Sequence, residues 1–285
     1  MKNRIAKKGF VLGLMVFVIG AVFVPSISAE IGRNTPTMSM NEYGCRSAST
    51  TDWWVMFRHD ASHSGYSSSL APQTNNVLWT YPTGIEISGS PAVVDGKVYI
   101  GSWDKKIYCL DAITGVKIWD YTTGLEITSS PAIVNGKVYI GSNDGKVYCL
   151  DANTGEKLWD YQTGVDVVSS PTIVDGNVYV GSRNHKVYCL DAETGTYIWD
   201  YTTGEDIISS PAVVDGKVFI GSWDDKVYCL NAETGTWIWD YTTGNDIYSS
   251  PAVADNKVYI GSSDNKVYCL DANTGEWIWD YPTGY

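Results

Sequence analysis

The sequence has few of the residues from which active sites are usually built. It contains only three histidines, no two of its six cysteines are adjacent, and it has no Cys-x-x-Cys-His motif for the attachment of haem. An enzyme needs different groups, such as a nucleophile, a base and a charge stabiliser, in one place. A chain made mostly of repeats has few unique residues for such a site, so the composition argues against catalysis.

Basic residues are also scarce. Lysine and arginine together number 20, against 32 aspartates and glutamates, which gives a net charge of −12. A surface of this sign repels nucleic acid and anionic lipid. We therefore expect no nucleic-acid partner, and any ligand that charge attracts is a cation.

Long apolar runs are absent after residue 24. The one such run, residues 9–24, follows four basic residues and precedes the small residues 26–29. It is shorter than the ~20 residues of a membrane-spanning helix. This layout is typical of a secretory signal peptide cleaved near Ser28 or Ala29, so we expect an extracellular, cell-surface or periplasmic protein. The alternative, an uncleaved anchor, would be its one contact with a membrane.

Disulfide bridges are not expected either. Five of the six cysteines recur every 40 residues, at Cys109, Cys149, Cys189, Cys229 and Cys269. Equivalent positions of successive repeats lie too far apart for a bridge, which needs Cα atoms within ~7 Å. We expect buried free thiols that pack as small apolar groups. Cys45 has no obvious partner.

The chain consists largely of one 40-residue unit that occurs five times. Its register is marked, without an insertion, by Pro91, Pro131, Pro171, Pro211 and Pro251. In the first unit four apolar runs are separated by turn residues, and Asp95-Gly96 suits a two-residue hairpin because both residues tolerate positive φ. The runs cover residues 90–94, 97–102, 106–111 and 116–121. This pattern predicts four antiparallel strands per unit.

The predicted strands are apolar on both faces. In the second run Val98 and Ile100 alternate with Tyr99, so other sheets must cover each sheet on both sides. Radial stacking of four-stranded sheets gives an all-β fold, the β-propeller. A linear β-solenoid is the competing architecture, but its repeats usually carry one or three short strands.

One motif of the unit is specific. The pattern Ala-x-Thr-Gly-x-x-x-Trp at residues 112–119 recurs in all five units, and it resembles the repeat of quinoprotein-like (PQQ-like) β-propellers with their tryptophan-docking motif. The match covers residues 77–285, whereas the Gly-His element of WD repeats is absent. The resemblance implies that one tryptophan per unit lies flat between adjacent blades. It assigns this structural role to Trp79, Trp119, Trp159, Trp199, Trp239 and Trp279.

The same resemblance raises the question of a cofactor. Quinoprotein dehydrogenases of this superfamily are long, usually eight-bladed enzymes with calcium, an acidic base and adjacent cysteines beneath the quinone. This chain has five units and no adjacent cysteines. We therefore expect neither PQQ nor dehydrogenase activity.

The units divide the chain into three parts. We predict a signal peptide at residues 1–29, a largely irregular entry segment at 30–76 and the propeller at 77–285. The blades are expected at about 89–121, 129–161, 169–201, 209–241 and 249–281.

One fourth strand is in surplus. Residues 77–81 align with residues 117–121, so there are six fourth strands but five sets of the other three. We favour a closed five-bladed ring with this strand left over. A partial, open ring and a shortened relative of a seven- or eight-bladed propeller are the alternatives. An exposed strand edge would favour self-association.

One position in the connections between units is always acidic. Its residues are Glu86, Glu126, Asp166, Asp206 and Asp246. In a propeller these carboxylates would converge near one mouth of the central channel, where like charges either raise one another's pKa or hold a cation. Oxygen ligands suit calcium or magnesium. The alternative is that each acid caps its own connection and faces solvent.

The histidines offer a weaker metal pattern. His59 and His63 lie four residues apart beside Asp60, a spacing that could hold a metal on a helix. We favour a hydrogen-bonded plug in which Arg58, His59 and Asp60 tie the entry segment to the propeller. His185 lies in a variable turn and is expected to be solvated.

These observations favour an exported, non-enzymatic protein that acts as an interaction or scaffold module and binds other proteins. A degenerate quinoprotein and a propeller that binds a cation or ligand in its central channel are the alternatives from other functional classes. The identity of the partner is not encoded in the repeats.

Overall fold

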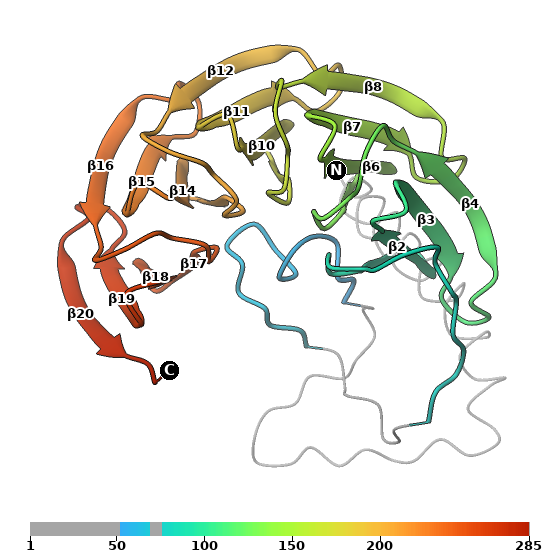
Figure 1. Ribbon diagram of the computed structural model, residues 1–285, viewed down its shortest axis with the longest axis horizontal. Coiled ribbons are helices and arrows are strands. Elements are labelled where there is room, and N and C mark those ends of the chain that lie inside the picture. Colours follow the sequence, from blue (N-terminus) through green and yellow to red (C-terminus); the bar gives the residue numbers. More distant parts are fainter. Residues whose placement is uncertain (1–51, 69–75, 285) are drawn as a thin grey trace, which may run out of the picture. The chain divides into compact units, whose positions relative to one another are not determined.

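The five repeats fold into five sheets of four antiparallel strands each. The computed structural model describes residues 52–68 and 76–284, and the following statements refer to these residues. They lie within one compact unit. In each sheet the strands follow one another in chain order, and the sheets are arranged as the blades of a propeller (Figure 1). The prediction of an all-β propeller is therefore confirmed.

The blades have these bounds. Blade 1 comprises β1 (Ala92–Val94), β2 (Lys97–Gly101), β3 (Lys106–Asp111) and β4 (Lys117–Thr122). Blade 2 comprises β5 (Ala132–Val134), β6 (Lys137–Ser142), β7 (Lys146–Asp151) and β8 (Lys157–Gln162). Blade 3 comprises β9 (Thr172–Val174), β10 (Asn177–Ser182), β11 (Lys186–Asp191) and β12 (Tyr197–Thr202). Blade 4 comprises β13 (Ala212–Val214), β14 (Lys217–Gly221), β15 (Lys226–Asn231) and β16 (Trp237–Thr242). Blade 5 comprises β17 (Ala252–Ala254), β18 (Lys257–Ser262), β19 (Lys266–Asp271) and β20 (Trp277–Pro282).

Local chemistry sets the turns within a blade. Asp95 and Gly96 have φ values of 49° and 71°, which is the geometry of a two-residue hairpin. Before the fourth strand, Asp111 Oδ1 accepts hydrogen bonds from the amides of Ile113 and Thr114. Asn231 does the same with its own Oδ1 in blade 4, so a carbonyl oxygen is all that this turn requires.

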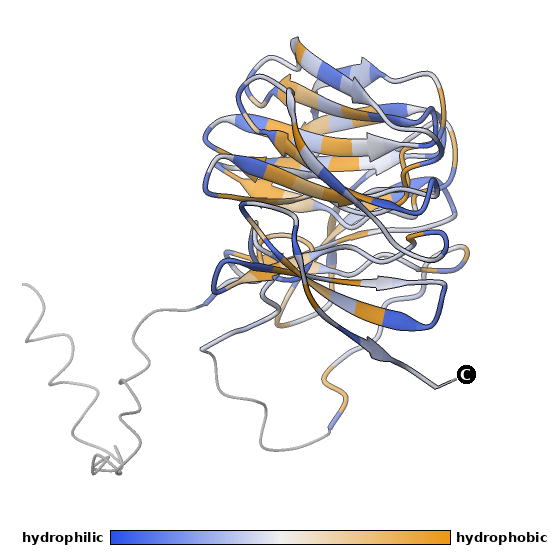
Figure 2. Cartoon of the chain, turned by 90° about the vertical axis from the view of Figure 1, so that its left-hand side faces the viewer, coloured by the Kyte–Doolittle hydropathy of each residue, from blue (hydrophilic) through white to orange (hydrophobic). Residues whose placement is uncertain are grey.

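Apolar side chains fill the spaces between neighbouring blades, and polar residues collect in the loops at the blade ends (Figure 2). Each interface has a tryptophan from the fourth strand of one blade against the Thr-Gly turn of the next. Trp199 Nε1 donates a hydrogen bond to Ala232 O at 3.0 Å, and a Cβ added to Gly235 would lie 2.6 Å from the Trp199 ring. Glycine is therefore required where the ring packs.

A second glycine in each interface receives an apolar side chain from the following connection. A Cβ added to Gly181 would lie 2.3 Å from Ile207 Cγ2, so the isoleucine fills the position of the missing side chain. Gly101, Gly141 and Gly221 receive Ile127, Val167 and Ile247 in the same way. These four apolar residues are fully buried.

The five blades form an arc that does not close. Serine side chains link the starts of successive blades. The amide of Ser90 donates a hydrogen bond to Ser130 Oγ, and three equivalent bonds follow along the arc as far as Ser250 Oγ. All four bonds measure 2.9 Å. Trp279 of blade 5 is 40% exposed, whereas Trp119, Trp159, Trp199 and Trp239 are 5% to 8% exposed. The prediction of a closed ring was wrong, and the open ring is the arrangement found (Figure 1).

The surplus fourth strand is only partly as expected. Trp79 packs on Gly115 and donates a hydrogen bond to Ala112 O at 3.0 Å, as Trp119, Trp159, Trp199 and Trp239 do with the turns of their next blades. However, residues 77–81 belong to no sheet, because no third strand lies beside them to pair with. The segment contacts blade 1 through side chains, including Tyr81 against Tyr108.

Residues 52–68, a described part of the entry segment predicted at 30–76, run across the inner strands, and we call them the plug. Its carbonyl oxygens at Trp54, Val55, Ala61 and Ser62 accept hydrogen bonds from the amides of Val93, Ile133, Val213 and Val253 in four blades. Met56 is buried in the core cluster of blades 2 and 3. The plug thus satisfies the open edges of the first strands.

Some predictions lie outside the described residues, namely the signal peptide at 1–29, its cleavage site and Cys45. Within the described residues the structure contains no helix of a length and apolarity that would cross a bilayer.

Candidate functional site

The blade end where the chain passes from one blade to the next carries the side chains that differ most between repeats. We call this end the connection face. It consists of residues 85–88 and 103–105 and their equivalents in the other four units. The turn position alone is Trp103, Asn143, Arg183, Trp223 and Ser263. Because the strands beneath are nearly identical, the face is one scaffold with five different sets of side chains.

Hydrogen bonds hold the connection face in a fixed geometry. In every blade the amide of the turn residue donates to the carbonyl of the acidic connection residue, for example Arg183 N to Asp166 O at 3.0 Å. The next turn residue adds a second hydrogen bond to the connection. In blade 4, for example, Asp224 Oδ2 accepts a hydrogen bond from Gly204 N at 2.6 Å. The variable side chains are therefore presented from a rigid backbone.

The predicted ring of acids lies on this face. Glu86 is exposed, and Glu126, Asp166, Asp206 and Asp246 are partly buried. Arg183 joins two successive members, since its Nη1 lies 3.8 Å from Asp166 Oδ2 and its Nε lies 2.9 Å from Asp206 Oδ2. Between blades 3 and 4, the protein itself thus supplies the cation that separates neighbouring carboxylates.

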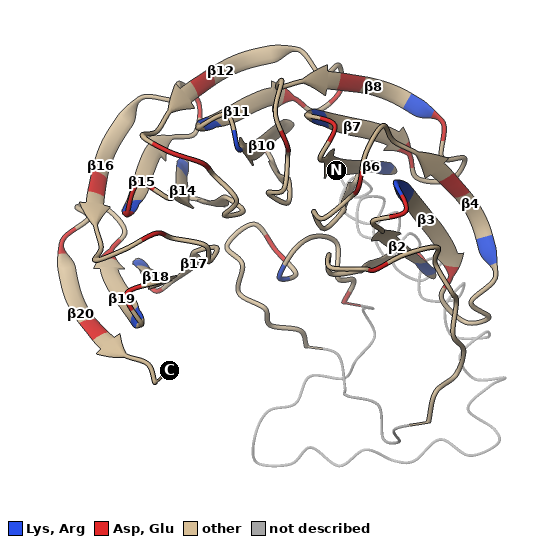
Figure 3. Cartoon of the chain, in the orientation of Figure 1, with Lys and Arg blue, Asp and Glu red and all other residues tan. Residues whose placement is uncertain are grey.

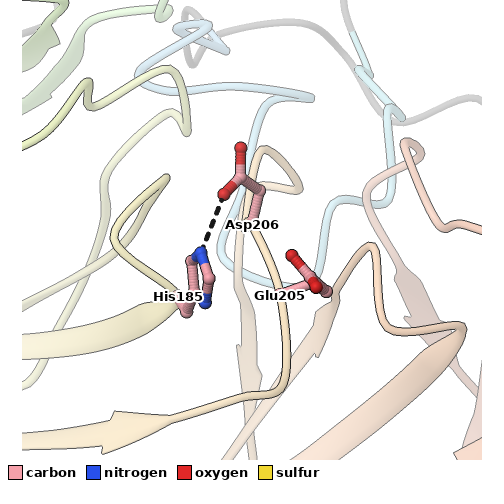
Figure 4. A group of neighbouring side chains, drawn as sticks. All are labelled: His185, Glu205 and Asp206. Atoms are coloured by element: carbon pink, nitrogen blue, oxygen red, sulfur yellow. Dashed lines mark ion pairs between the residues drawn. The ribbon is translucent and has the colours of Figure 1, made fainter.

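His185 and Glu205 extend this cluster (Figure 4). His185 Nε2 lies 3.2 Å from Asp206 Oδ1, so one carboxylate contacts Arg183 through one oxygen and His185 through the other. The prediction that His185 is merely solvated was wrong. The ligand atoms of His185, Glu205 and Asp206 lie within 4.8 Å of one another.

This group does not fit calcium well. Calcium takes six to eight oxygen ligands, whereas the group offers two carboxylates and one imidazole. A histidine with carboxylates suits a transition metal better. Arg183 lies 2.9 Å from Asp206 and already partly neutralises it.

Aromatic side chains continue the cluster toward blade 5. The Arg183 guanidinium carbon lies 5.3 Å from the centroid of the Trp223 ring, and the Tyr248 ring lies 4.9 Å from the same ring, between centroids. Trp223 Nε1 is buried and has no hydrogen-bond acceptor in the described structure. By contrast, Trp103 at the equivalent position of blade 1 donates to Ser88 Oγ at 2.8 Å.

Variation at the outer rim has a simpler explanation. The first residue of the fourth strand changes from Lys117 and Lys157 to Tyr197, Trp237 and Trp277. Each of these bonds to the aspartate three residues later, as Trp237 Nε1 does to Asp240 Oδ1 at 2.8 Å. The role of this position is therefore kept while its residue type varies.

The histidines of the plug face different partners and do not form one site. His63 is buried and its Nδ1 bonds Pro251 O at 2.9 Å, whereas His59 Nε2 bonds Asp52 Oδ1 at 2.9 Å. Arg58 reaches Ser250 O at 3.3 Å. Burial lowers the pKa of His63 to about 4, although its bond to Pro251 opposes this shift. These contacts are those of a plug, which is the structure that the sequence favoured for this segment.

The periodic cysteines are unsuited to redox chemistry. All five are free and buried, and burial raises the pKa of Cys149 to about 12. A thiol with such a pKa stays protonated and unreactive at neutral pH.

A small pocket of mixed polar and apolar lining lies between blades 4 and 5, on the side away from the connection face. It has a volume of about 260 Å³ and is lined by residues that include Ser62, Asp215, Lys217, Asp255 and Asn256. Ligand sites for small molecules are usually larger and mostly apolar, at ~300–1,000 Å³.

Sequence reasoning found the acidic position but missed Arg183, Trp223 and Tyr248. The signal was present, because the turn position differs in most units while its neighbours repeat. What the sequence alone could not supply was the proximity of a turn in one blade to the connection that leads to the next.

The fold, the plug and the connection face can be compared with known proteins. The family model described as "Beta-alanine-activating enzyme, beta-propeller" matches residues 60–284. The chain belongs to this β-propeller family. The match begins inside the plug and includes all five blades. Among curated proteins none matches the chain.

Solved structures show the same fold in other proteins. The crystal structure of BamB from Moraxella catarrhalis aligns with a TM-score of 0.66 and 24% identity over 72% of this chain and 67% of that protein. Quinohemoprotein alcohol dehydrogenase from Comamonas testosteroni aligns with a TM-score of 0.72 and 20% identity over 85% of this chain. The chain covers only 51% of that dehydrogenase and 58% of a europium-containing methanol dehydrogenase. At these identities the likeness concerns the fold alone, which is a β-propeller.

Proposed function

We propose that this protein is an exported, non-enzymatic interaction module that binds another protein through the connection face of blades 3 to 5. The tryptophan-docking repeat provides the rigid scaffold. The observation that carries the proposal is the contiguous cluster of Arg183, Trp223 and Tyr248 with the charged residues Asp206 and His185. Tryptophan, tyrosine and arginine are the residues that most often dominate the energy of protein interfaces.

Two features favour a protein over a small molecule as the partner. The cluster spans three blades and presents both charge and aromatic surface, as an interface does. The negative charge spread over the blades (Figure 3) favours a partner with a basic surface, because complementary charge speeds association.

The test is binding by matched variants. Wild-type protein, Trp223→Ala and Arg183→Glu would be immobilised and exposed to extracellular and periplasmic fractions of the native cells. Trp237→Ala is the control, since Trp237 is 53% exposed on the outer rim. A protein retained by wild type and by the control, identified and purified, should bind either cluster variant at least about tenfold more weakly, because a hot-spot truncation costs ~2 kcal/mol. Equal affinity for all four proteins would contradict the proposal.

A second candidate function is cation binding. The group of His185, Glu205 and Asp206 favours it, although the acidic ring as a whole remains the wider candidate. Calorimetry with calcium and with zinc would compare the wild type with a variant in which Asp166, Asp206 and Asp246 are changed to Asn. Saturable binding lost in the variant supports the site, and equal binding or none excludes it.

A further inference from the structure

The two ends of the arc are complementary halves of the interface that joins neighbouring blades. Each internal interface has a glycine recess on one side and an apolar side chain from the next connection on the other. At blade 5 no described apolar side chain enters the recess at Gly261, because an added Cβ would meet nothing in the described structure nearer than Ser249 Oγ at 3.5 Å. At blade 1 the matching side chain, Ile87, is 44% exposed, whereas its four equivalents are fully buried.

The site where a tryptophan packs on the Thr-Gly turn of the next blade is also divided between the two ends of the arc. Trp279 is 40% exposed and Tyr281 is 67% exposed on the free face of blade 5. In an internal interface these positions pack on a Thr-Gly turn and on a tyrosine of the next blade, as Tyr201 does on Tyr228 at 5.8 Å between centroids. Blade 1 carries that turn at Gly115 and that tyrosine at Tyr108, and residues 79–81 currently cover both.

We propose that the protein associates head to tail, with blade 5 of one copy docked on blade 1 of a second copy. In this contact Ile87 of one copy enters the Gly261 recess of the other. Trp279 takes the seat of Trp79, whose segment belongs to no sheet. The exchange of one tryptophan for another keeps the bond to Ala112 O, Tyr281 replaces Tyr81 on Tyr108, and the burial of Ile87 is gained.

The plug favours a second copy over closure within one chain. It bonds the amides of Val93 in blade 1 and Val253 in blade 5 through residues 54 and 62. Arg58 also binds Ser250 O. These contacts fix the spacing of the two end blades, so the same molecule could join its ends only by expelling the plug. The contact is heterologous, because the two surfaces differ, and it leaves a free end on each copy.

The test uses one variant for each half of the interface. Ile87→Asp disables the blade 1 end, and Gly261→Val fills the recess at the blade 5 end. Ile85→Asp is the control, since Ile85 lies in the same connection, is exposed and has no recess to enter. Sedimentation velocity should show that the mass of the wild type and the control rises with concentration, while each disabling variant stays monomeric with an unchanged melting temperature.

A mixture of the two disabling variants tests the proposed contact more directly than either variant alone. An equal mixture of the two disabling variants has one intact pair of ends, so it should form dimers and nothing larger. A wild type that stays monomeric at all concentrations, or a mixture that does not dimerise although both variants are folded, overturns the proposal.

A cross-link separates the two modes of closure. In a double variant with Ile87→Cys and Gly261→Cys, made together with Cys45→Ser, oxidation should join chains end to end and give bands at twice the mass of one chain and at higher multiples on a non-reducing gel. A cross-link that leaves the mass of one chain would show closure within the molecule instead, and would also overturn the proposal.

Discussion

At the scale of single residues, the interfaces between blades depend on pairs of a tryptophan and a glycine. Trp199 is buried between blades 3 and 4, donates to Ala232 O and lies against Gly235. Trp279 has the same place in its own repeat but lies at the end of the arc. Trp199 and Trp279 therefore occupy the same position of the repeat but differ in burial, so comparing them isolates the effect of packing between blades.

We expect Trp199→Ala to lower the free energy of unfolding by roughly 3–5 kcal/mol, the usual cost of truncating a buried tryptophan. Trp279→Ala should cost less, because Trp279 is 40% exposed and less apolar surface leaves the water on folding. Urea unfolding of both variants measures the difference. Equal losses would mean that the end of the arc is packed like an internal interface.

His63 makes stability depend on pH. Its pKa is lowered by burial from 6.5 to about 4, so the unfolded state binds a proton more readily than the folded state does. The stability due to neutral His63 is therefore complete above about pH 6.5 and is lost as the pH falls toward 4. Arg58 and Asp60 are the charged groups that act on it, with opposite signs.

The expected loss between pH 7 and pH 4 is at most about 3 kcal/mol, from the size of the shift. His63→Gln keeps a donor for Pro251 O but does not titrate, so its stability should fall less over this range. Thermal unfolding of both proteins at a series of pH values measures the difference. Parallel curves for the two proteins would contradict the assignment.

At the scale of the elements, most of a blade could be predicted from the sequence. Alternating apolar residues, the Asp-Gly turn and the Thr-Gly turn define the four strands of each repeat to within two residues. The first strand is shorter than its pattern, since it begins at Ala92 and not at Ser90. The reason is that the Ser90 amide bonds the side chain of Ser130 in the next blade and is not available to a strand within its own blade.

The plug was less predictable, because it has no repeat and no alternation. Its backbone turns through positive φ at Arg58, His59 and His63, and its partners lie in four different blades. Contacts of this kind become visible only when the blades are placed around a common centre. The same holds for Arg183, which reaches an acid from the connection on either side.

Removing the plug should expose the inner strand edges. The amides of Val93, Ile133, Val213 and Val253 would lose their acceptors, and unpaired edges promote aggregation. We expect a chain without residues 52–68 to melt at a lower temperature and to scatter light at concentrations where the wild type does not. Tyr66→Ser, at an exposed plug residue, is the control and should behave as the wild type. An unchanged melting temperature and no aggregation would show that the segment is a passive tail.

At the scale of the whole molecule, the repeat specifies how one blade meets the next but not how many blades complete a turn. The angle between blades depends on the size of the side chains between them, which a period of 40 residues does not reveal. The sequence therefore predicted the sheets and left ring closure open. Exposure of Trp279 and Ile87 at opposite ends of the arc decides the question in favour of an open arc held by its plug.

The open arc can be tested by comparing two distances in one experiment. Spin labels would be placed on the equivalent turn positions Lys105 and Gly145 of neighbouring blades, and in a second sample on Lys105 and Asn265 at the ends of the arc. Dilution with unlabelled protein removes contributions from associated copies. Both samples carry Cys45→Ser, and the five buried native thiols do not react with the label. We expect a markedly longer distance for the end pair than for the neighbouring pair. Equal distances would mean that blade 5 lies against blade 1 in a closed ring, and would contradict the open arc.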